Sequence, residues 1–237
     1  MFSSYTGVGK FGRRGEISAS GIVVSNMTLF LNPNSPASYS GSGSTWTDLA
    51  GTADNITLVN SPAFTSGSPS YFTFNNASTQ YGTGSATNIL PSTAYTKSVY
   101  FYLNSQTDNN LVSSLNGGHY MFFAGGLTLY AGHSNVQPYF GAGAFGSTNT
   151  LSLNTWYYAA VTYSTTNGIK LYINGVLSNS NASFTAHTGD GSVNLACFGA
   201  GGNLLNGRLG HVFCYSKELS AGEVLQNFNS TKSLYGL

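Results

Sequence analysis

Short runs of β-branched and aromatic residues recur along the chain from residue 26 onward, and Gly, Asn, Ser or Pro separates each run from the next. Such runs favour β-strands, because branched and aromatic side chains pack well on a pleated surface while the separating residues form turns. Their number and close spacing predict an all-β fold, a two-sheet antiparallel jelly-roll sandwich. The predicted strands cover residues 27–31, 55–59, 71–74, 97–103, 110–114, 120–123, 127–130, 137–140, 156–163, 169–173, 192–198 and 208–215.

Two of these strands are joined by a recognisable turn. Asn174 and Gly175 stand between two apolar runs, which is the strongest short-range signal for a β-hairpin. Trp156 heads the strand before this pair and is expected to be structural. His211 lies in the last predicted strand, and we expect it to be half-buried near a strand edge.

One short helix is predicted near the C-terminus. Ser220 and Glu223 have the spacing of a capping box, in which each side chain satisfies a backbone N–H of the other residue. Val224, Leu225 and Phe228 follow at helical spacing and give the helix one apolar face. We expect this helix to pack over one end of the sandwich.

The surface is predicted to be polar but almost uncharged. Charged residues make up 6% of the chain, whereas about 25% is usual in globular proteins, and Ser, Thr, Asn and Gly together account for 111 of the 237 residues. A net charge of +1 supplies no basic patch for nucleic acid, and no apolar run is long enough to insert into a membrane. The stability and binding of a protein with such a surface depend only weakly on salt concentration, which suits an extracellular particle or appendage.

Residues 1–25 differ from the rest of the chain, and we assign residues 26–237 to a single domain. The first segment is rich in glycine and in basic residues and has no strand or helix period. It is either a frayed terminus or an extended arm that becomes ordered against a partner. No secretory signal is expected, because the apolar stretch that follows the basic residues, at 22–24, is too short. The candidate docking residues are Phe2, Tyr5, Lys10, Phe11, Arg13 and Arg14.

Four stretches carry a family pattern. They are LNTWYYAAVTY at 153–163, IKLYINGV at 169–176, LNGRLGHV at 205–212 and YSKELSAGEV at 215–224. In order and spacing they resemble laminin-G-like jelly rolls of the concanavalin A-like lectin/glucanase superfamily. The resemblance implies the fold over about residues 27–235. It implies little about function, because that superfamily contains lectins, hydrolases, lyases and adhesion modules.

The residues that the family's enzymes use are missing. Glycoside hydrolysis needs a pair of carboxylates, and Glu16, Glu218 and Glu223 have no second carboxylate at the family's spacing. Lyase relatives use a base, for which His119 or His133 would serve, together with an arginine that neutralises a uronate. No arginine lies between Arg14 and Arg208, so we expect no catalytic residues and no enzyme activity.

No metal or other cofactor is expected. The aspartates are isolated, so at most a weak calcium site with a single carboxylate could form. They are Asp48, Asp54, Asp108 and Asp190. Cys197 and Cys214 do not have the spacing of a zinc site. Buried free thiols are the first expectation for these cysteines, and a disulfide between neighbouring strands is the alternative.

Binding of a glycan needs no charge, because sugars stack on aromatic rings and hydrogen-bond to amides. Loop aromatics are therefore the candidate glycan-binding residues, although a role in the core is the competing interpretation for each of them. They are Tyr39, Trp46, Tyr81, Tyr120, Tyr139, Phe140 and Phe145.

These observations favour a non-enzymatic virion structural protein, such as a capsid decoration, fibre or tail appendage of a phage. It would dock by its N-terminal arm to other virion proteins or to itself as an oligomer, and its jelly roll would face the host surface, where glycans are the expected ligands. A free-standing carbohydrate-binding lectin is the alternative, and a polysaccharide-degrading enzyme is a third, weaker hypothesis. The expected location is the virion or an extracellular surface.

Overall fold

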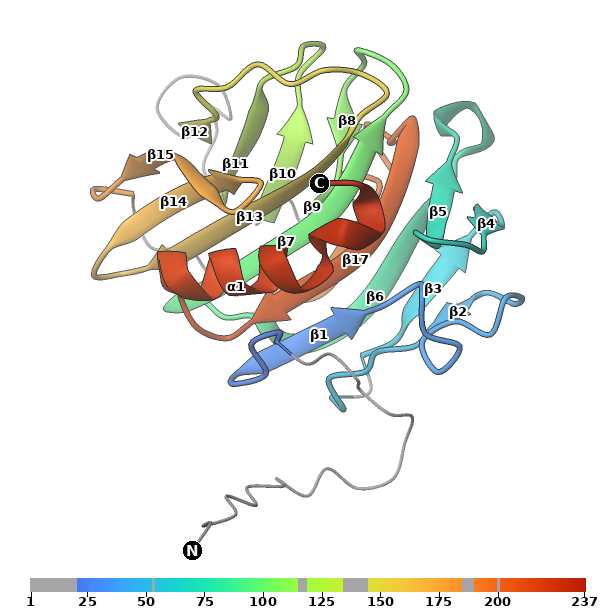
Figure 1. Ribbon diagram of the computed structural model, residues 1–237, viewed down its shortest axis with the longest axis horizontal. Coiled ribbons are helices and arrows are strands. Elements are labelled where there is room, and N and C mark those ends of the chain that lie inside the picture. Colours follow the sequence, from blue (N-terminus) through green and yellow to red (C-terminus); the bar gives the residue numbers. More distant parts are fainter. Residues whose placement is uncertain (1–20, 53, 115–118, 134–144, 185–189, 200) are drawn as a thin grey trace, which may run out of the picture.

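The computed structural model describes residues 21–52, 54–114, 119–133, 145–184, 190–199 and 201–237. Within these ranges the chain forms antiparallel sheets and one α-helix, which confirms the predicted all-β sandwich (Figure 1). Short 3-10 helices follow β5 and end the chain, at Asn76–Ser78 and Lys232–Tyr235.

One layer of the sandwich is an eight-stranded sheet. Its strand order is β15-β14-β13-β7-β17-β5-β4, and β1 pairs with β17 beside this path. The strands are β1 (Met27–Leu31), β4 (Ala63–Thr65), β5 (Tyr71–Phe74), β7 (Ala94–Leu103), β13 (Trp156–Ser164), β14 (Gly168–Ile173), β15 (Val176–Asn181) and β17 (Gly207–Tyr215).

Two smaller sheets form the other layer. The five-stranded sheet runs in the order β2 (Thr45–Trp46), β3 (Ile56–Val59), β6 (Tyr81–Leu90), β16 (Asp190–Leu195) and β9 (Val112–Ser113). The four-stranded sheet runs in the order β12 (Phe145–Gly146), β11 (Leu129–His133), β10 (His119–Phe123) and β8 (Asn109–Asn110). Apolar residues of all three sheets meet in one core, so the two smaller sheets pack against the large one.

A single helix, α1 (Ala221–Thr231), lies across the outer face of the eight-stranded sheet (Figure 1). The predicted capping box is confirmed, since Ser220 Oγ accepts from Glu223 N at 3.2 Å and Glu223 Oε2 accepts from Ser220 N at 2.9 Å. Val224 and Phe228 are buried in a second apolar cluster between helix and sheet. Leu225 differs from the expectation, because it lies at the edge of the helix and is 42% exposed.

The longest strand that the sequence pattern misses is β6. Its sequence contains Gly82 and Gly84, which weaken a strand prediction. Both glycines lie directly over Ile56, and a Cβ atom on either one would come within 2.8 Å of that side chain. The strand therefore depends on close packing between neighbouring strands, which cannot be predicted from the propensities of its own residues.

Two single-residue expectations also need correction. His211 is 2% exposed and lies in the middle of β17, beneath the C-terminal turn, rather than half-buried near a strand edge. Its Nδ1 lies 2.7 Å from the hydroxyl of Tyr235. Trp156 is only half-buried, because it lies on the outer face of the sheet and not in the core between the layers. Cys197 and Cys214 are buried and free, as first expected.

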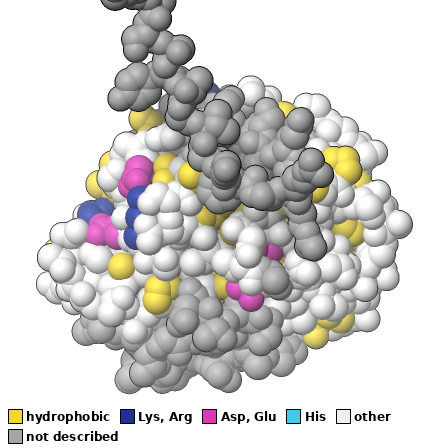
Figure 2. All heavy atoms as spheres, turned by 90° about the horizontal axis from the view of Figure 1, so that it is seen from below, with side chains coloured by type: hydrophobic (Ala, Val, Ile, Leu, Met, Phe, Trp, Pro, Cys, Tyr) yellow, Lys and Arg dark blue, Asp and Glu magenta, His cyan; other side chains and the backbone are white. Residues whose placement is uncertain are grey.

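The described surface is mostly neutral. Figure 2 shows one face on which few charged side chains interrupt the neutral ones. Two salt bridges join Lys170 to Glu218 at 2.5 Å and Lys217 to Glu223 at 2.6 Å. In the part of the chain that the structure describes, no helix is both long and apolar enough to cross a membrane.

Candidate ligand-binding pocket

A small cavity opens where the four-stranded sheet meets the loop between β16 and β17. Its volume is about 100 Å³, which is below the 300–1,000 Å³ of sites for drug-sized ligands and suits part of one sugar ring. Polar and aromatic side chains share the lining. They are Asp108, Asn110, Tyr120, Phe122, Ala124, Phe198 and Asn203.

Strand pairing brings the floor of the cavity together. Asn110 of β8 pairs directly with Phe122 of β10, so both side chains lie on the same face of the sheet. Alternation along β10 places Met121 and Phe123 in the core and leaves Phe122 on the opposite face. Tyr120 lies on that face too, and its ring contacts the Phe122 ring at 5.7 Å.

Asn109 fixes the two loops that form the rim. Its side-chain amide donates to the carbonyl oxygens of Ser105 and Thr107, at 3.0 and 2.8 Å. Its Oδ1 accepts from the backbone N–H of Asn206 at 2.8 Å, so one buried side chain ties the loop before β8 to the loop before β17. The rim is therefore held by hydrogen bonds before any ligand arrives.

Asn110 belongs to the cavity lining, and its side chain holds a buried acceptor without a partner. The side chain is 1% exposed, and its Nδ2 donates to the carbonyl oxygen of Asn203 at 3.0 Å. This bond fixes the orientation of the amide, because the reversed orientation would place two oxygens together. Oδ1 has no hydrogen-bond partner among the described residues. An unmet buried acceptor costs about 1–3 kcal/mol, which a ligand hydroxyl could recover.

Two half-buried aromatic rings complete the cavity. Phe122 packs against Tyr130, with ring centroids 5.7 Å apart, and is half-buried. Phe198 is also half-buried, and its backbone pairs with Gly202 through bonds of 2.7 and 2.9 Å. Asp108 and Asn203 are exposed at the rim. Apolar rings beside amide and carboxylate acceptors can bind a hydroxylated ring, and the Asp108 carboxylate disfavours an anion.

The sequence-predicted aromatics occupy different environments. Tyr39 and Trp46 are 7% and 0% exposed and pack against Phe72 in the core, so neither offers a surface to a sugar. Tyr120 is buried but lines the cavity. Tyr81 is half-exposed at the start of β6 and stays a prediction. Outside the description lie Tyr139, Phe140, the side chain of Phe145 and the docking residues Phe2, Tyr5, Lys10, Phe11, Arg13 and Arg14.

Sequence analysis missed most of the cavity lining. Asn109 and Asn110 end a polar stretch directly before the apolar pair Leu111 and Val112, and two adjacent amides at the start of a strand are the available signal. Phe122 and Phe198 lie in predicted strands, and nothing local distinguishes a strand phenylalanine that faces a cavity from one in the core.

The two glutamates that the structure describes stabilise the fold. Glu218 accepts from Lys170, Ser164 and Asn167, and these bonds outweigh burial and lower the pKa of the carboxyl. Glu223 is held by its cap and by Lys217. His119 and His133 are almost completely buried. In the described ranges, no three His, Cys, Asp or Glu side chains gather in a way that could hold a metal ion.

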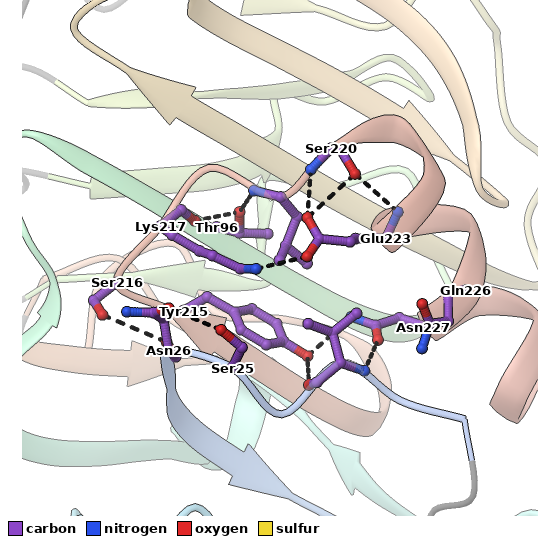
Figure 3. Close-up of polar contacts among 12 residues, drawn as sticks. Ser25, Asn26, Thr96, Tyr215, Ser216, Lys217, Ser220, Glu223, Gln226 and Asn227 are labelled. Atoms are coloured by element: carbon purple, nitrogen blue, oxygen red, sulfur yellow. Dashed lines mark hydrogen bonds and ion pairs between the residues drawn. The ribbon is translucent and has the colours of Figure 1, made fainter.

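The start of the described chain is fastened to helix α1 (Figure 3). Asn227 Oδ1 accepts from the backbone N–H of Val23 at 2.8 Å, and the hydroxyl of Tyr215 donates to the carbonyl oxygen of Val23 at 2.9 Å. Gln226 donates to the carbonyl oxygen of Gly21 at 2.7 Å. Ile22 and Val23 are buried. Residues 21–23 thus pack against the domain.

Several solved structures share the fold. The binding domain of Paraclostridial Mosquitocidal Protein 1 matches with a TM-score of 0.66 and 17% identity, over 87% of this chain and 52% of that one. The botulinum neurotoxin DC binding domain matches in complex with SialylT (TM-score 0.66) and with rat synaptotagmin II (TM-score 0.63), each at 12% identity over 88% of this chain and 52% of that one. This chain therefore spans about half of those structures, and at such identity the likeness shows the fold alone.

The family assignment rests on a separate comparison. No curated protein matches the chain. A family model described as the concanavalin A-like lectin/glucanases superfamily matches residues 66–225. This span covers more than half of the chain and includes the four stretches that carry the resemblance. The chain belongs to the concanavalin A-like lectin/glucanases superfamily.

Proposed function

We propose that this protein is a non-enzymatic binding protein whose jelly roll takes up a neutral glycan in the cavity between β8, β10 and the loop after β16. The buried, unpartnered Oδ1 of Asn110 is the observation that carries this proposal. Most proteins satisfy such an atom internally, so an unpaired acceptor on a residue of the cavity lining supports a ligand that donates a hydrogen bond to it.

A sugar ring meets the chemistry of every part of this cavity. A hydroxyl group would donate to Asn110 Oδ1, and the Asp108 carboxylate at the rim would accept from a second hydroxyl. The apolar C–H face of the ring would lie against Phe122 and Phe198, which line the cavity. These acceptors sit on paired strands and tied loops, so little conformational entropy is lost on binding.

The arrangement of carboxylates argues for binding without hydrolysis. Glycosidases place two carboxyl groups about 5–10 Å apart across the scissile bond. Asp108 is the single carboxylate among the described residues that line the cavity, and the described glutamates are engaged in ion pairs and hydrogen bonds elsewhere. We therefore propose a lectin-like role for the chain.

We further propose that the domain is displayed on a virion or similar surface appendage, with residues 1–20 as the docking arm. The neutral surface supports this, because attraction and repulsion between crowded copies would change little with salt. The anchored segment at Gly21–Val23 supports it as well, because the arm would leave the domain at a fixed point on helix α1. A free-standing lectin is the second candidate.

Truncating the cavity should abolish glycan binding without unfolding the domain. On a printed array of neutral and acidic oligosaccharides, we expect Asn110→Ala and Phe122→Ala each to weaken binding of the best neutral glycan tenfold or more, since one lost hydrogen bond or stacking contact is worth about 1–2 kcal/mol. Asn229→Ala, an exposed amide on helix α1, is the matched control and should bind normally. Unchanged binding by folded cavity variants would refute the proposed site.

Removing the arm should abolish assembly. We expect the full-length protein to form oligomers in multi-angle light scattering, or to bind its structural partner, and a chain of residues 21–237 to stay monomeric and folded. The full-length monomer has a mass of 24.9 kDa, so a dimer or trimer is readily distinguished. If both proteins are identical monomers that capture no partner, the docking role of the arm is wrong and the free-standing lectin is favoured.

A further inference from the structure

A second surface feature lies on the outer face of the eight-stranded sheet. Strand pairing aligns Trp156, Tyr102, Arg208 and Thr73 side by side across β13, β7, β17 and β5. Tyr71 of β5 adds a further ring, whose centroid is 5.6 Å from that of Trp156. All five side chains are half-buried. We call them the Arg208 patch.

The guanidinium of Arg208 is held by aromatic rings. Its Cζ lies 4.3 Å from the ring centroid of Tyr102 and 4.9 Å from that of Tyr71. The Tyr102 and Trp156 rings are themselves 5.6 Å apart. Such contacts use the flat faces of the guanidinium and leave its N–H groups, which point outward in the plane, free to donate. The fork is therefore fixed in position before a ligand binds.

Among the described residues, no acidic group balances this charge. The side chain of Arg208 makes no hydrogen bond or ion pair with any of them. Three of the other four described cations differ, because Lys170 and Lys217 are each paired with a glutamate and Lys97 is buried. Lys232 lies over the ring of Phe228, 5.2 Å from its centroid. Arg208 thus combines a fixed geometry with an unpaired charge beside an accessible indole.

The C-terminal 3-10 helix, Lys232–Tyr235, lies beside the Arg208 patch. Tyr235 is buried against Trp156, with ring centroids 4.8 Å apart, and covers one side of the indole. Helix α1 covers the sheet around Tyr100 and Tyr158, and it leaves the end of the sheet that carries Arg208 half-exposed. The backbone is crowded there, since a Cβ on Gly207 would lie 2.2 Å from the carbonyl oxygen of Tyr102.

We propose that the Arg208 patch binds a sugar that carries a carboxylate. The guanidinium would take the carboxylate in a two-bond fork, which is the geometry that arginine and carboxylate groups prefer. The sugar ring would lie against Trp156. A sialic acid and a uronic acid share this chemistry, a carboxylate on a pyranose ring. The proposal does not depend on the cavity, whose exposed Asp108 favours neutral ligands.

Tryptophan fluorescence offers a direct test. The chain holds two tryptophans, and Trp46 is completely buried, so a ligand at the surface should change the emission of Trp156 alone. The probes are 3′-sialyllactose and a glucuronic acid oligomer, with lactose as the neutral control. We expect at least one acidic probe to change the emission and to bind at least tenfold more tightly than lactose. The stronger of the two identifies the source of the carboxylate.

Variants separate this site from general charge effects and from the cavity. Arg208→Gln should lower the affinity for the acidic probe tenfold or more, and Arg208→Lys should retain part of it. Lys232→Gln removes the same charge nearby and should have little effect, and Asn110→Ala should bind the acidic probe normally. Equal binding of lactose, no response to either acidic probe, or equal losses in Arg208→Gln and Lys232→Gln would overturn the proposal. Circular dichroism confirms that each variant is folded.

Discussion

Replacing Lys97 by methionine is expected to abolish a rise in stability that the wild-type protein shows between pH 7 and pH 9. Lys97 is completely buried between the layers, where its Nζ donates to the carbonyl oxygens of Tyr120 at 2.8 Å and Gly132 at 3.4 Å. Burial disfavours the charged form and lowers the pKa of Lys97 to about 7, from 10.5 in an exposed lysine.

The direction of this stability change follows from proton binding to the folded and unfolded chains. Between the folded pKa of about 7 and the unfolded value of 10.5, the unfolded chain holds the proton more strongly, so raising the pH favours the folded state. The slope approaches about 1.4 kcal/mol per pH unit, or roughly 2–3 kcal/mol between pH 7 and 9. Burial lowers the pKa of His211 to about 3, so this residue affects the pH dependence of stability only below pH 6.5. Burial raises the pKa of Cys197 and Cys214 to about 12, so stability falls again above about pH 9.

Urea unfolding at pH 7, 8 and 9 measures this effect. We expect the free energy of unfolding of the wild type to rise across the series and that of Lys97→Met to stay flat and to start higher at pH 7. Lys232→Met, a half-exposed lysine on the C-terminal turn, should keep the wild-type slope. An equal slope in Lys97→Met and wild type would show that Lys97 is not the titrating group.

Replacing Asp48 by alanine should cost about 3–5 kcal/mol of stability. Its carboxylate accepts from the backbone N–H groups of Phe30 and Ala50 at 2.8 Å each, and from the N–H and hydroxyl of Thr52 at 3.2 and 2.8 Å. The residue is 7% exposed and joins β1 to the loop after β2. Hydrogen bonds to a charged acceptor are worth about 1.5–3 kcal/mol each, and buried donors without a partner add a penalty.

A matched pair of variants isolates the role of Asp48. Asp48→Asn keeps the shape of the side chain but replaces one acceptor oxygen by an NH2 donor that faces the same partners. We therefore expect an intermediate loss of stability. Asp54→Asn alters a half-buried carboxylate in the same loop and should change the free energy of unfolding by less than about 0.5 kcal/mol. Denaturant titration compares the three variants. A loss below 1 kcal/mol in Asp48→Ala would contradict the structural role.

Local chemistry explains what could be predicted from the sequence. The capping box of Ser220 and Glu223 and the turn at Asn174 and Gly175 depend on residues within three positions of each other. The turn residues have φ values of 50° and 78°, the left-handed conformations that such a hairpin requires. The strands that escape prediction differ, because β6 depends on pairing with β3 and β16 and on close packing of its glycines against Ile56, all distant in the sequence.

The candidate sites were harder to predict because they depend on which face of a strand is covered. Trp46 and Trp156 both lie in strands, yet the first is in the core and the second is on the outer face. Arg208 is a candidate because strand pairing places it between Tyr71 and Tyr102. Asn110 is a candidate because its buried acceptor has no partner. Each of these facts is a property of tertiary packing.

A crystal structure of the protein with the best neutral glycan from the array tests the central claim most directly. The account predicts a sugar ring between Phe122 and Phe198, with one hydroxyl within 3.2 Å of Asn110 Oδ1 and another near the Asp108 carboxylate. A glycan bound elsewhere on the domain, with this cavity holding only solvent, would contradict the account.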